Sequence, residues 1–172
     1  MFNTARASAS PGNGQHNPSI SGLNPLGAKD LLQPMHMLKT YIIEDSQVIR
    51  ENLIATLEEL VPVEVVGTAE DESSAVQWLM RPNNRFDLVI IDIFLKSGSG
   101  LGVLRSLRSL NDRPHKLVVL SNYATQDMRD KCREMGADRV FDKSNDIDAL
   151  LQYCSELATD TDPRGDGLAS AA

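Results

Sequence analysis

Five short apolar runs, rich in β-branched residues, alternate with segments of helical periodicity along the middle of this chain. The apolar runs are 38–43, 63–67, 86–91, 116–120 and 139–141. Each run is followed by apolar residues at intervals of three and four, which indicates an amphipathic helix. Five strands that each lead into a helix predict an α/β fold in which helices cover both faces of one parallel sheet. Because crossovers between parallel strands are right-handed, we expect a doubly wound five-stranded sheet.

The predicted helices begin and end at residue types that are common at helix ends. Thr125 and Gly136 stand at the two ends of the fourth predicted helix, as an N-cap and a left-handed C-terminal cap. Pro62 ends the first predicted helix, whose apolar stripe begins at Ile49. Ile49 is therefore predicted to face the core, and the alternative is that its helix face docks a partner protein.

The two ends of the chain differ in composition from the middle. Residues 1–36 are rich in Ser, Asn, Gly and Pro and carry few apolar residues, which predicts a disordered N-terminal segment. Residues 159–172 are similarly polar or small and are also predicted to be disordered. The intervening residues, 37–158, are expected to form one domain, and no second domain is expected at either end.

Charge and hydropathy exclude several classes of function. The chain has 17 basic and 24 acidic residues and a net charge of −7, which disfavours nucleic-acid binding through a basic surface. No apolar stretch is long enough to span a bilayer, and the N-terminus lacks the pattern of a secretion signal, so we expect a cytoplasmic protein without membrane contact. Cys132 and Cys154 have neither a neighbouring cysteine nor a histidine at metal-ligand spacing and are expected to be reduced thiols.

Polar side chains follow four of the five predicted strands. These residues are Glu44 and Asp45, Asp92, Ser121 and Lys143. Because ligands bind at the carboxyl ends of the strands in open α/β sheets, these side chains are expected to meet at one edge. Carboxylates gathered at one point repel one another unless they bind a cation, and their hard oxygens suit Mg²⁺. A hydroxyl and an ammonium nearby are groups that bind phosphoryl oxygens. Taken singly, each residue has a plainer interpretation as a turn, capping or solvated side chain.

The same positions, with Gly100 eight residues after Asp92, resemble the receiver domain of bacterial two-component response regulators. The resemblance extends from about Leu38 to Leu157. It implies the flavodoxin-like (βα)5 fold of that family and a role in phosphorelay signal transduction. It also implies a signalling receiver rather than an enzyme with an external substrate.

The resemblance implies a role for each residue of the predicted site. Asp92 is similar to the phosphoacceptor, which takes a phosphoryl group from a histidine kinase or a histidine phosphotransfer protein. Asp45, Asp92 and the backbone carbonyl of Phe94 would hold Mg²⁺, with Glu44 acting largely through water. Two further residues, Ser121 and Lys143, would contact the bound phosphoryl group.

Several residues depart from the family pattern. Val140 stands where the family usually has the aromatic residue of its conformational switch, and Phe141 is expected on the opposite face of the strand. Lys96 replaces the usual proline of the loop after Asp92. Phe94 and Tyr123 are expected to flank the approach of a hydrolytic water, which predicts a slowly hydrolysing acyl phosphate.

Three functional classes fit these residues. The first is a single-domain response regulator that acts by protein contact, since no output domain follows Leu157. The second is a phosphate sink or shuttle in a phosphorelay, which Val140 favours. The third is a pseudo-receiver that serves only for docking, against which Asp92 and Lys143 argue. A phosphatase of the haloacid dehalogenase type is disfavoured because Phe94 occupies the position of its second carboxylate. The fourth and fifth predicted helices are equally compatible with a homodimer face and with a partner surface.

Overall fold

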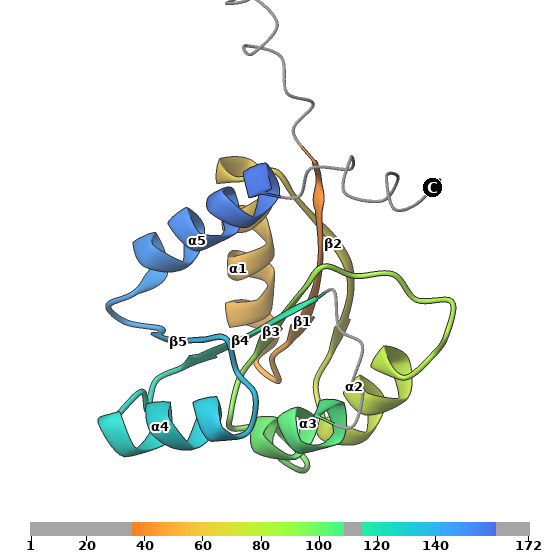
Figure 1. Cartoon of the computed structure of the whole chain (residues 1–172), viewed down its shortest axis with the longest axis vertical. Coiled ribbons are helices and arrows are strands. Elements are labelled where there is room, and N and C mark those ends of the chain that lie inside the picture. Colours follow the sequence, from red (N-terminus) through yellow and green to blue (C-terminus); the bar gives the residue numbers. More distant parts are fainter. Residues whose placement is uncertain (1–35, 109–114, 161–172) are drawn as a thin grey trace, which may run out of the picture. The chain divides into compact units, whose positions relative to one another are not determined.

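The computed structural model of the chain describes residues 36–108 and 115–160 (Figure 1). Its five strands form one parallel sheet in the order β2-β1-β3-β4-β5. The strands are β1 (Leu38–Ile43), β2 (Val63–Ala69), β3 (Leu88–Ile91), β4 (Lys116–Ser121) and β5 (Arg139–Asp142). This order confirms the predicted five-stranded parallel α/β fold, and it places β1 and β3 side by side at the centre.

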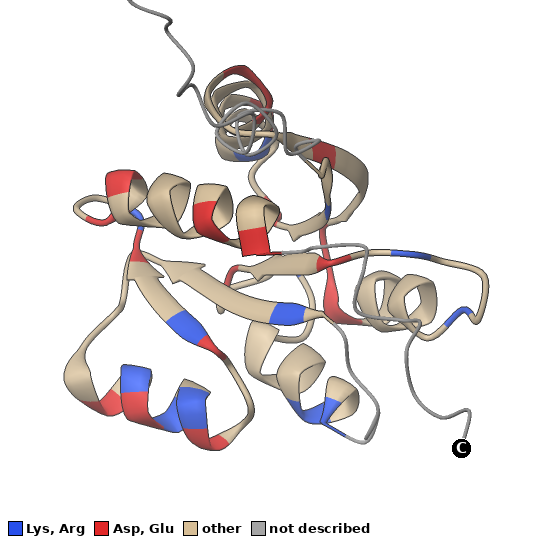
Figure 2. Cartoon of the chain, turned by 45° about the horizontal axis from the view of Figure 1, so that its top comes forward, with Lys and Arg blue, Asp and Glu red and all other residues tan. Residues whose placement is uncertain are grey.

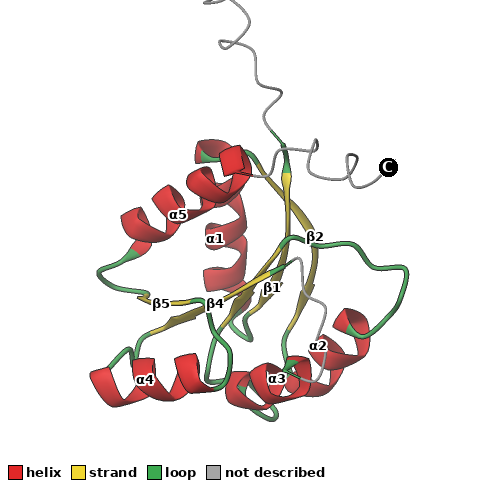
Figure 3. Ribbon diagram, viewed as in Figure 1, coloured by secondary structure: helices red, strands yellow, loops and turns green. Residues whose placement is uncertain are grey.

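Helices cover both faces of the sheet, as a doubly wound fold requires. They are α1 (Gln47–Leu60), α2 (Glu72–Leu79), α3 (Gly100–Leu107), α4 (Gln126–Glu134) and α5 (Ile147–Asp160). Figure 3 shows α1 and α5 on one face of the strands and α2, α3 and α4 on the other. Each layer has its own apolar core, because buried residues of α1 and α5 form one cluster and those of α2, α3 and α4 form another.

The central strand β3 is apolar along its whole length, because helices cover both of its faces. All four residues of β3 are buried. In β1, Ile42 packs toward α1 and α5, whereas its neighbours Tyr41 and Ile43 pack toward α2, α3 and α4. Continuous apolar runs are typical of parallel strands buried on both faces. Because successive residues of a strand point to opposite faces of the sheet, each strand contributes to both cores.

The third strand begins at Leu88, two residues later than predicted. The carboxylate of Asp87 accepts a hydrogen bond of 2.8 Å from the backbone N–H of Lys39. A side chain therefore satisfies a β1 donor at the point where the sheet ladder would otherwise continue. Phe86 lies beyond this point and packs against Trp78 and His115 instead.

The prediction that Ile49 belongs to the core is wrong. Leu53 and Leu57 of the same helical stripe are buried, but 38% of Ile49 is exposed. The physical reason is that Ile49 lines a groove between α1 and the start of α5, together with Asn52 and Ile147. The spacing of apolar residues identifies which face of α1 is turned inward. It does not show how far α5 covers that face, and Ile49 lies where the groove leaves it exposed.

The predicted terminal segments, 1–36 and 159–172, lie largely outside the described residues. Thr159 and Asp160 are described, and they continue α5 rather than belonging to the C-terminal segment. Within residues 36–108 and 115–160, no helix combines the length and the apolar character that crossing a bilayer demands.

Charged side chains of both signs are interspersed on α4, whereas α5 carries acidic ones (Figure 2). On α4, Arg133 pairs with Asp130 at 3.0 Å. The charged residues of α5 are Asp148, Glu156 and Asp160. These two helices therefore present no continuous basic face, and the expectation that the chain does not bind nucleic acid stays a prediction.

The two cysteines yield a test of the core. Cys132 and Cys154 are free and buried on opposite faces of the sheet. Burial raises the pKa of the Cys154 thiol to about 12, and burial also raises the pKa of Cys132. Because the thiolate is the reactive form, we expect neither thiol to react readily with Ellman's reagent at about pH 8 in the folded protein. Both should react after unfolding in guanidinium chloride, and rapid labelling of the native chain would contradict the described packing.

Candidate functional site

Three carboxylates converge where β1 and β3 end. The parallel register pairs Ile43 with Ile91, so the residues that follow these two positions are neighbours. The backbone N–H of Asp92 donates to the carbonyl of Ile43 at 2.9 Å, which continues the ladder by one residue. One oxygen from each of Glu44, Asp45 and Asp92 lies within 4.8 Å of the others. The structure therefore brings together the three acids that the sequence analysis selected.

Two of these acids are buried, and local hydrogen bonds fix the first of them. Glu44 is 2% exposed and Asp92 is 7% exposed, whereas Asp45 is half-buried. The Glu44 carboxylate accepts a hydrogen bond of 3.0 Å from the N–H of Ser46, and its backbone carbonyl accepts one of 2.7 Å from Arg50. The start of α1 thus holds Glu44 in the pocket.

Lys143 supplies the positive charge of the pocket. Its Nζ donates to Asp92 Oδ2 at 2.7 Å and also to Glu44 Oε2. Burial lowers the pKa of this ammonium, but hydrogen bonds and charge from Asp92 and Glu44 outweigh burial, so the pKa is raised overall. Lys143 is therefore a stable cation that touches two of the three carboxylates.

Ser121 ends β4 next to the strand that leads into Lys143. Ser121 is fully buried, and its carbonyl accepts a hydrogen bond of 3.2 Å from the N–H of Lys143. Its Oγ accepts a hydrogen bond of 3.4 Å from the N–H of Tyr123. Since that contact uses an oxygen lone pair, the hydroxyl proton remains available for donation.

The loop after Asp92 turns tightly back on the sheet. The N–H of Gly100 donates to the carbonyl of Ile93 at 2.9 Å, and a Cβ on Gly100 would overlap the carbonyl group of Asp92. A glycine eight residues after Asp92 is therefore required by the close approach of the two backbones. The N–H of Phe94 faces the Asp92 carboxylate at 3.4 Å.

Two aromatic side chains lie beside the pocket on separate loops. The rings of Phe94 and Tyr123 are in edge contact, with centroids 4.9 Å apart. They are 52% and 62% exposed. Each belongs to a residue two positions after a pocket residue, Asp92 or Ser121, so the pair links the two loops at the surface.

Val140 and Phe141 face opposite sides of β5. Val140 is buried in the core toward α2, α3 and α4, whereas Phe141 is buried in the core toward α1 and α5. The predicted offset of the aromatic ring is therefore confirmed. The face that carries Val140 holds an aliphatic side chain at this position.

Arg129 of α4 is a structural residue that the sequence analysis missed. Its guanidinium donates to the carbonyls of Ala124 and Val140, at 2.9 and 2.5 Å, and to Asp146 Oδ2 at 2.9 Å. A backbone hydrogen bond from Asp142, followed by the contact with Arg129, lowers the pKa of Asp146. No motif marks Arg129, because its partners come from three separate segments.

The donor set of the pocket fits a hard divalent cation. Its carboxylate oxygens are the ligands that Mg²⁺ prefers, and Asp45 keeps one of them accessible to water. Three formal negative charges and one positive charge also leave the cluster with a net negative charge. A bound cation would offset that charge.

Comparison with known proteins identifies the family. Residues 40–155 match the family model described as the response regulator receiver domain. The chain therefore belongs to the receiver domains of two-component response regulators. Such domains interact with histidine kinases or phosphotransfer proteins, bind Mg²⁺ at an acidic pocket and serve phosphorelay signalling.

The curated relatives that match this chain are longer than the chain itself. It is 31% identical over 121 residues to protein-glutamate methylesterase/protein-glutamine glutaminase 5 of Anaeromyxobacter dehalogenans, a match that covers 69% of this chain and 32% of the relative. It is 25% identical over 115 residues to the transcriptional regulatory protein YdfI of Bacillus subtilis. This match covers 67% of this chain and 52% of the relative. The chain thus spans about a third to a half of these curated relatives.

Solved structures share the fold. The receiver domain of the Francisella response regulator 1452 has a TM-score of 0.63 and 22% identity, over 73% of this chain and 99% of that domain. A response regulator from Burkholderia pseudomallei, solved with a phosphorylated aspartic acid and a calcium ion, has a TM-score of 0.58 and 22% identity over 71% of this chain and 69% of its own.

The contacts of Arg129 give a prediction for stability. Arg129→Ala removes three hydrogen-bond partnerships and leaves the part-buried carbonyl of Val140 without this donor. We expect a loss of about 2 kcal/mol in the free energy of unfolding, measured by urea denaturation. Arg133→Ala is the matched control, since it removes an exposed ion pair on the same helix and should cost about 0.5 kcal/mol or less. Equal losses in the two variants would contradict the role assigned to Arg129.

Proposed function

We propose that this chain accepts a phosphoryl group on Asp92 from a histidine kinase or a histidine phosphotransfer protein and signals by protein contact. The observation that carries the proposal is the convergence of Asp92 with Glu44, Asp45 and Lys143 at the carboxyl edge of the sheet. The relatives extend well beyond this domain, so the activities of those longer proteins are not assigned to this chain.

The proposed reaction is a phosphoryl transfer between two side chains. A carboxylate oxygen of Asp92 attacks the phosphorus of a phosphohistidine, an O–P bond forms, and the P–N bond breaks with its electrons going to the imidazole of the donor. The product is an acyl phosphate on Asp92. The phosphorylated aspartic acid in the Burkholderia response regulator, which shares the fold, supports this chemistry.

The pocket residues divide the remaining work. Glu44, Asp45, Asp92 and the backbone carbonyl of Phe94 would hold Mg²⁺, which when bound neutralises charge between an anionic nucleophile and an anionic donor. Lys143 already lies 2.7 Å from the Asp92 carboxylate, so its ammonium is within reach of a phosphoryl group attached there. The buried hydroxyl at the end of β4, on Ser121, would donate a hydrogen bond to the same group.

A groove beside Lys143 supports docking of the phosphoryl donor. It is lined by side chains of α1 and of the segment that starts α5, among them Ile49, Leu53 and Ile147. Ile49 is exposed there, and its neighbour Val48 is 68% exposed. Exposed apolar residues next to a reactive centre suit contact with a partner protein. We therefore assign this face to the kinase or phosphotransfer protein.

A labelling experiment tests the proposal. With radiolabelled acetyl phosphate and Mg²⁺, we expect the wild-type chain to become labelled and Asp92→Asn to remain unlabelled, because the amide is not a nucleophile for phosphorus. Asp142→Asn is the matched control and should label as the wild type does, since it removes a nearby acid whose partners are Ser144 and Asn145. Failure of the wild-type chain to label, with acetyl phosphate and with a panel of kinases, would favour a pseudo-receiver that serves only for docking.

The aromatic pair predicts the lifetime of the acyl phosphate. Phe94 and Tyr123 carry no carboxylate or amide that could orient a hydrolytic water, and their contact covers the surface between the two loops. We expect Phe94→Asn to hydrolyse roughly tenfold faster than the wild type, which corresponds to about 1.4 kcal/mol in barrier height. Decay of the labelled protein in Mg²⁺ measures this difference. Leu60→Asn, a substitution of an exposed residue at the end of α1, is the control, and equal decay in all three proteins would refute shielding.

A phosphate sink or shuttle is the second candidate. Val140 is buried at the position where the family usually has its aromatic switch residue, which favours phosphoryl acceptance with little change of shape. Two results would favour this candidate over an output by protein contact. The label would return rapidly from Asp92 to a histidine phosphotransfer protein, and phosphorylation would change the amide NMR chemical shifts of α4 very little.

A further inference from the structure

The loop that carries the proposed metal ligand Phe94 is closed by a contact with Ser99. These two residues form an isolated antiparallel bridge across the loop. Ser99 is also the N-cap of α3, where its Oγ accepts a hydrogen bond of 3.1 Å from the N–H of Gly102. The position of the Phe94 backbone is therefore tied to the cap of α3.

The cap of α3 is half of a capping box. In that motif, the side chain of the N-cap residue accepts from the N–H of the N3 residue, and a glutamate at N3 accepts from the N–H of the N-cap residue. Ser99 makes the first contact. The N3 residue is Gly102, which has no side chain with which to make the second.

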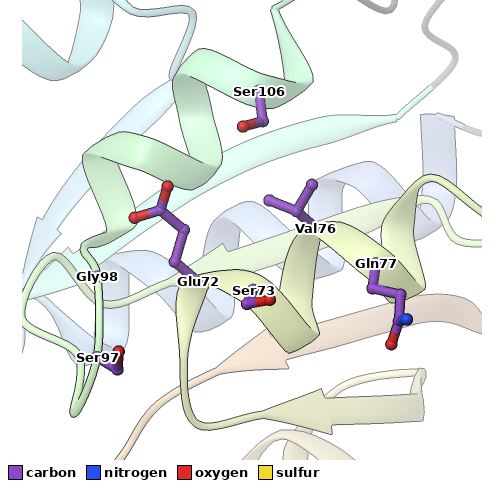
Figure 4. Close-up of a pocket in the computed structure, with 7 residues that line it drawn as sticks. All are labelled: Glu72, Ser73, Val76, Gln77, Ser97, Gly98 and Ser106. Atoms are coloured by element: carbon purple, nitrogen blue, oxygen red, sulfur yellow. The ribbon is translucent and has the colours of Figure 1, made fainter.

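Glu72, the first residue of α2, makes the missing contact. Its Oε2 accepts a hydrogen bond of 2.9 Å from the N–H of Ser99, twenty-seven residues away in the sequence. The backbone N–H of Glu72 donates to the carbonyl of Ser97 at 3.1 Å, so the residue contacts the loop at two points. Figure 4 shows the Glu72 side chain reaching from α2 toward the first turn of α3.

Gly102 leaves the space that this carboxylate occupies. A Cβ on Gly102 would overlap the carboxylate atoms of Glu72. The site can therefore hold an acidic side chain from α2 or a side chain at position 102, but not both in this arrangement. A glycine in a helix is otherwise unfavourable relative to alanine.

We propose that Glu72, which belongs to α2, completes the capping box of α3 and thereby positions the Phe94 carbonyl for Mg²⁺. The part that concerns the metal rests on the proposed function, because Phe94 is a ligand only in that function. Glu72 acts through Ser99 and is a positioning residue. Its carboxylate does for α3 what a glutamate at position 102 would do within the helix.

Two measurements test this proposal: amide hydrogen exchange at Ser99 without metal, and Mg²⁺ affinity by calorimetry. For Glu72→Ala we expect exchange at Ser99 roughly tenfold faster, since the acceptor of its N–H is lost. We also expect Mg²⁺ to bind roughly tenfold more weakly, at the lower end of the effect of residues that orient ligands. Glu72→Gln keeps an oxygen that accepts from Ser99 and should resemble the wild type in exchange.

Asp71→Ala controls for a general loss of stability. Asp71 is the N-cap of α2 and bonds Ser74, so its removal should destabilise the protein without removing the carboxylate that accepts from Ser99. We expect the Ser99 exchange and the Mg²⁺ affinity of this variant to stay near those of the wild type. If Asp71→Ala changes both as much as Glu72→Ala does, the positioning role is overturned.

Moving the carboxylate gives a sharper test. In Glu72→Ala/Gly102→Glu the acid returns as an ordinary capping box within α3, so slow exchange at Ser99 and Mg²⁺ affinity should both be restored. Glu72→Ala/Gly102→Ala also replaces the glycine by a residue that favours a helix but adds no carboxylate, so exchange at Ser99 should stay fast. Equal behaviour of these two double variants would overturn the proposal.

Failure of the proposed function is distinguishable from failure of this inference. If the wild-type chain takes up no Mg²⁺, the proposed metal site falls, and the positioning role falls with it. The Ser99 exchange pattern then still decides whether Glu72 caps α3. If the wild type binds Mg²⁺ and is labelled on Asp92, but Glu72→Ala matches it in both measurements, the inference alone is overturned.

Discussion

The pairing of β1 with β3 is the constraint on which the site depends. It places Glu44 and Asp92 one residue beyond paired positions, so their carboxylates share one buried pocket. Such acids repel one another at short range, and removing them from water adds to the cost. Lys143 offsets both effects, because its ammonium contacts the two most buried carboxylates. The register of β1 and β3 therefore brings the buried acids together, and the Lys143 ammonium stabilises the acids that this register places side by side.

The sequence predicts this arrangement well because its signals are local. A parallel strand buried on both faces is a continuous apolar run, and the first polar residues after it lie at the edge of the sheet where ligands bind. Contacts between distant segments leave no such signal. Ile49 has the periodicity of a core residue, yet the groove beside α5 exposes it. The contact from Glu72 to Ser99 was missed for a similar reason, since a Ser followed at N3 by a Gly does not read as a capping box.

Arg129 connects the loop that follows Ser121 with the loop that follows Lys143. Its guanidinium bonds Ala124, in the loop after Ser121, and Asp146, in the loop after Lys143. A displacement of either loop changes the geometry of hydrogen bonds that also involve α4. Val140, which is buried in β5, contributes its carbonyl to the same guanidinium. One contact to a backbone carbonyl and one to a carboxylate thus link the two loops through Arg129.

The loop between β3 and α3 separates a fixed backbone from exposed side chains. Backbone contacts hold it at both ends, from Asp92 to Ile43 and from Gly100 to Ile93, and Glu72 holds the cap of α3. The ring of Phe94 nevertheless projects outward and meets Tyr123 at the surface. A carbonyl that is to bind a cation needs an accurate position, which the backbone contacts supply. The rings of Phe94 and Tyr123 are exposed, so they can change without disturbing that carbonyl.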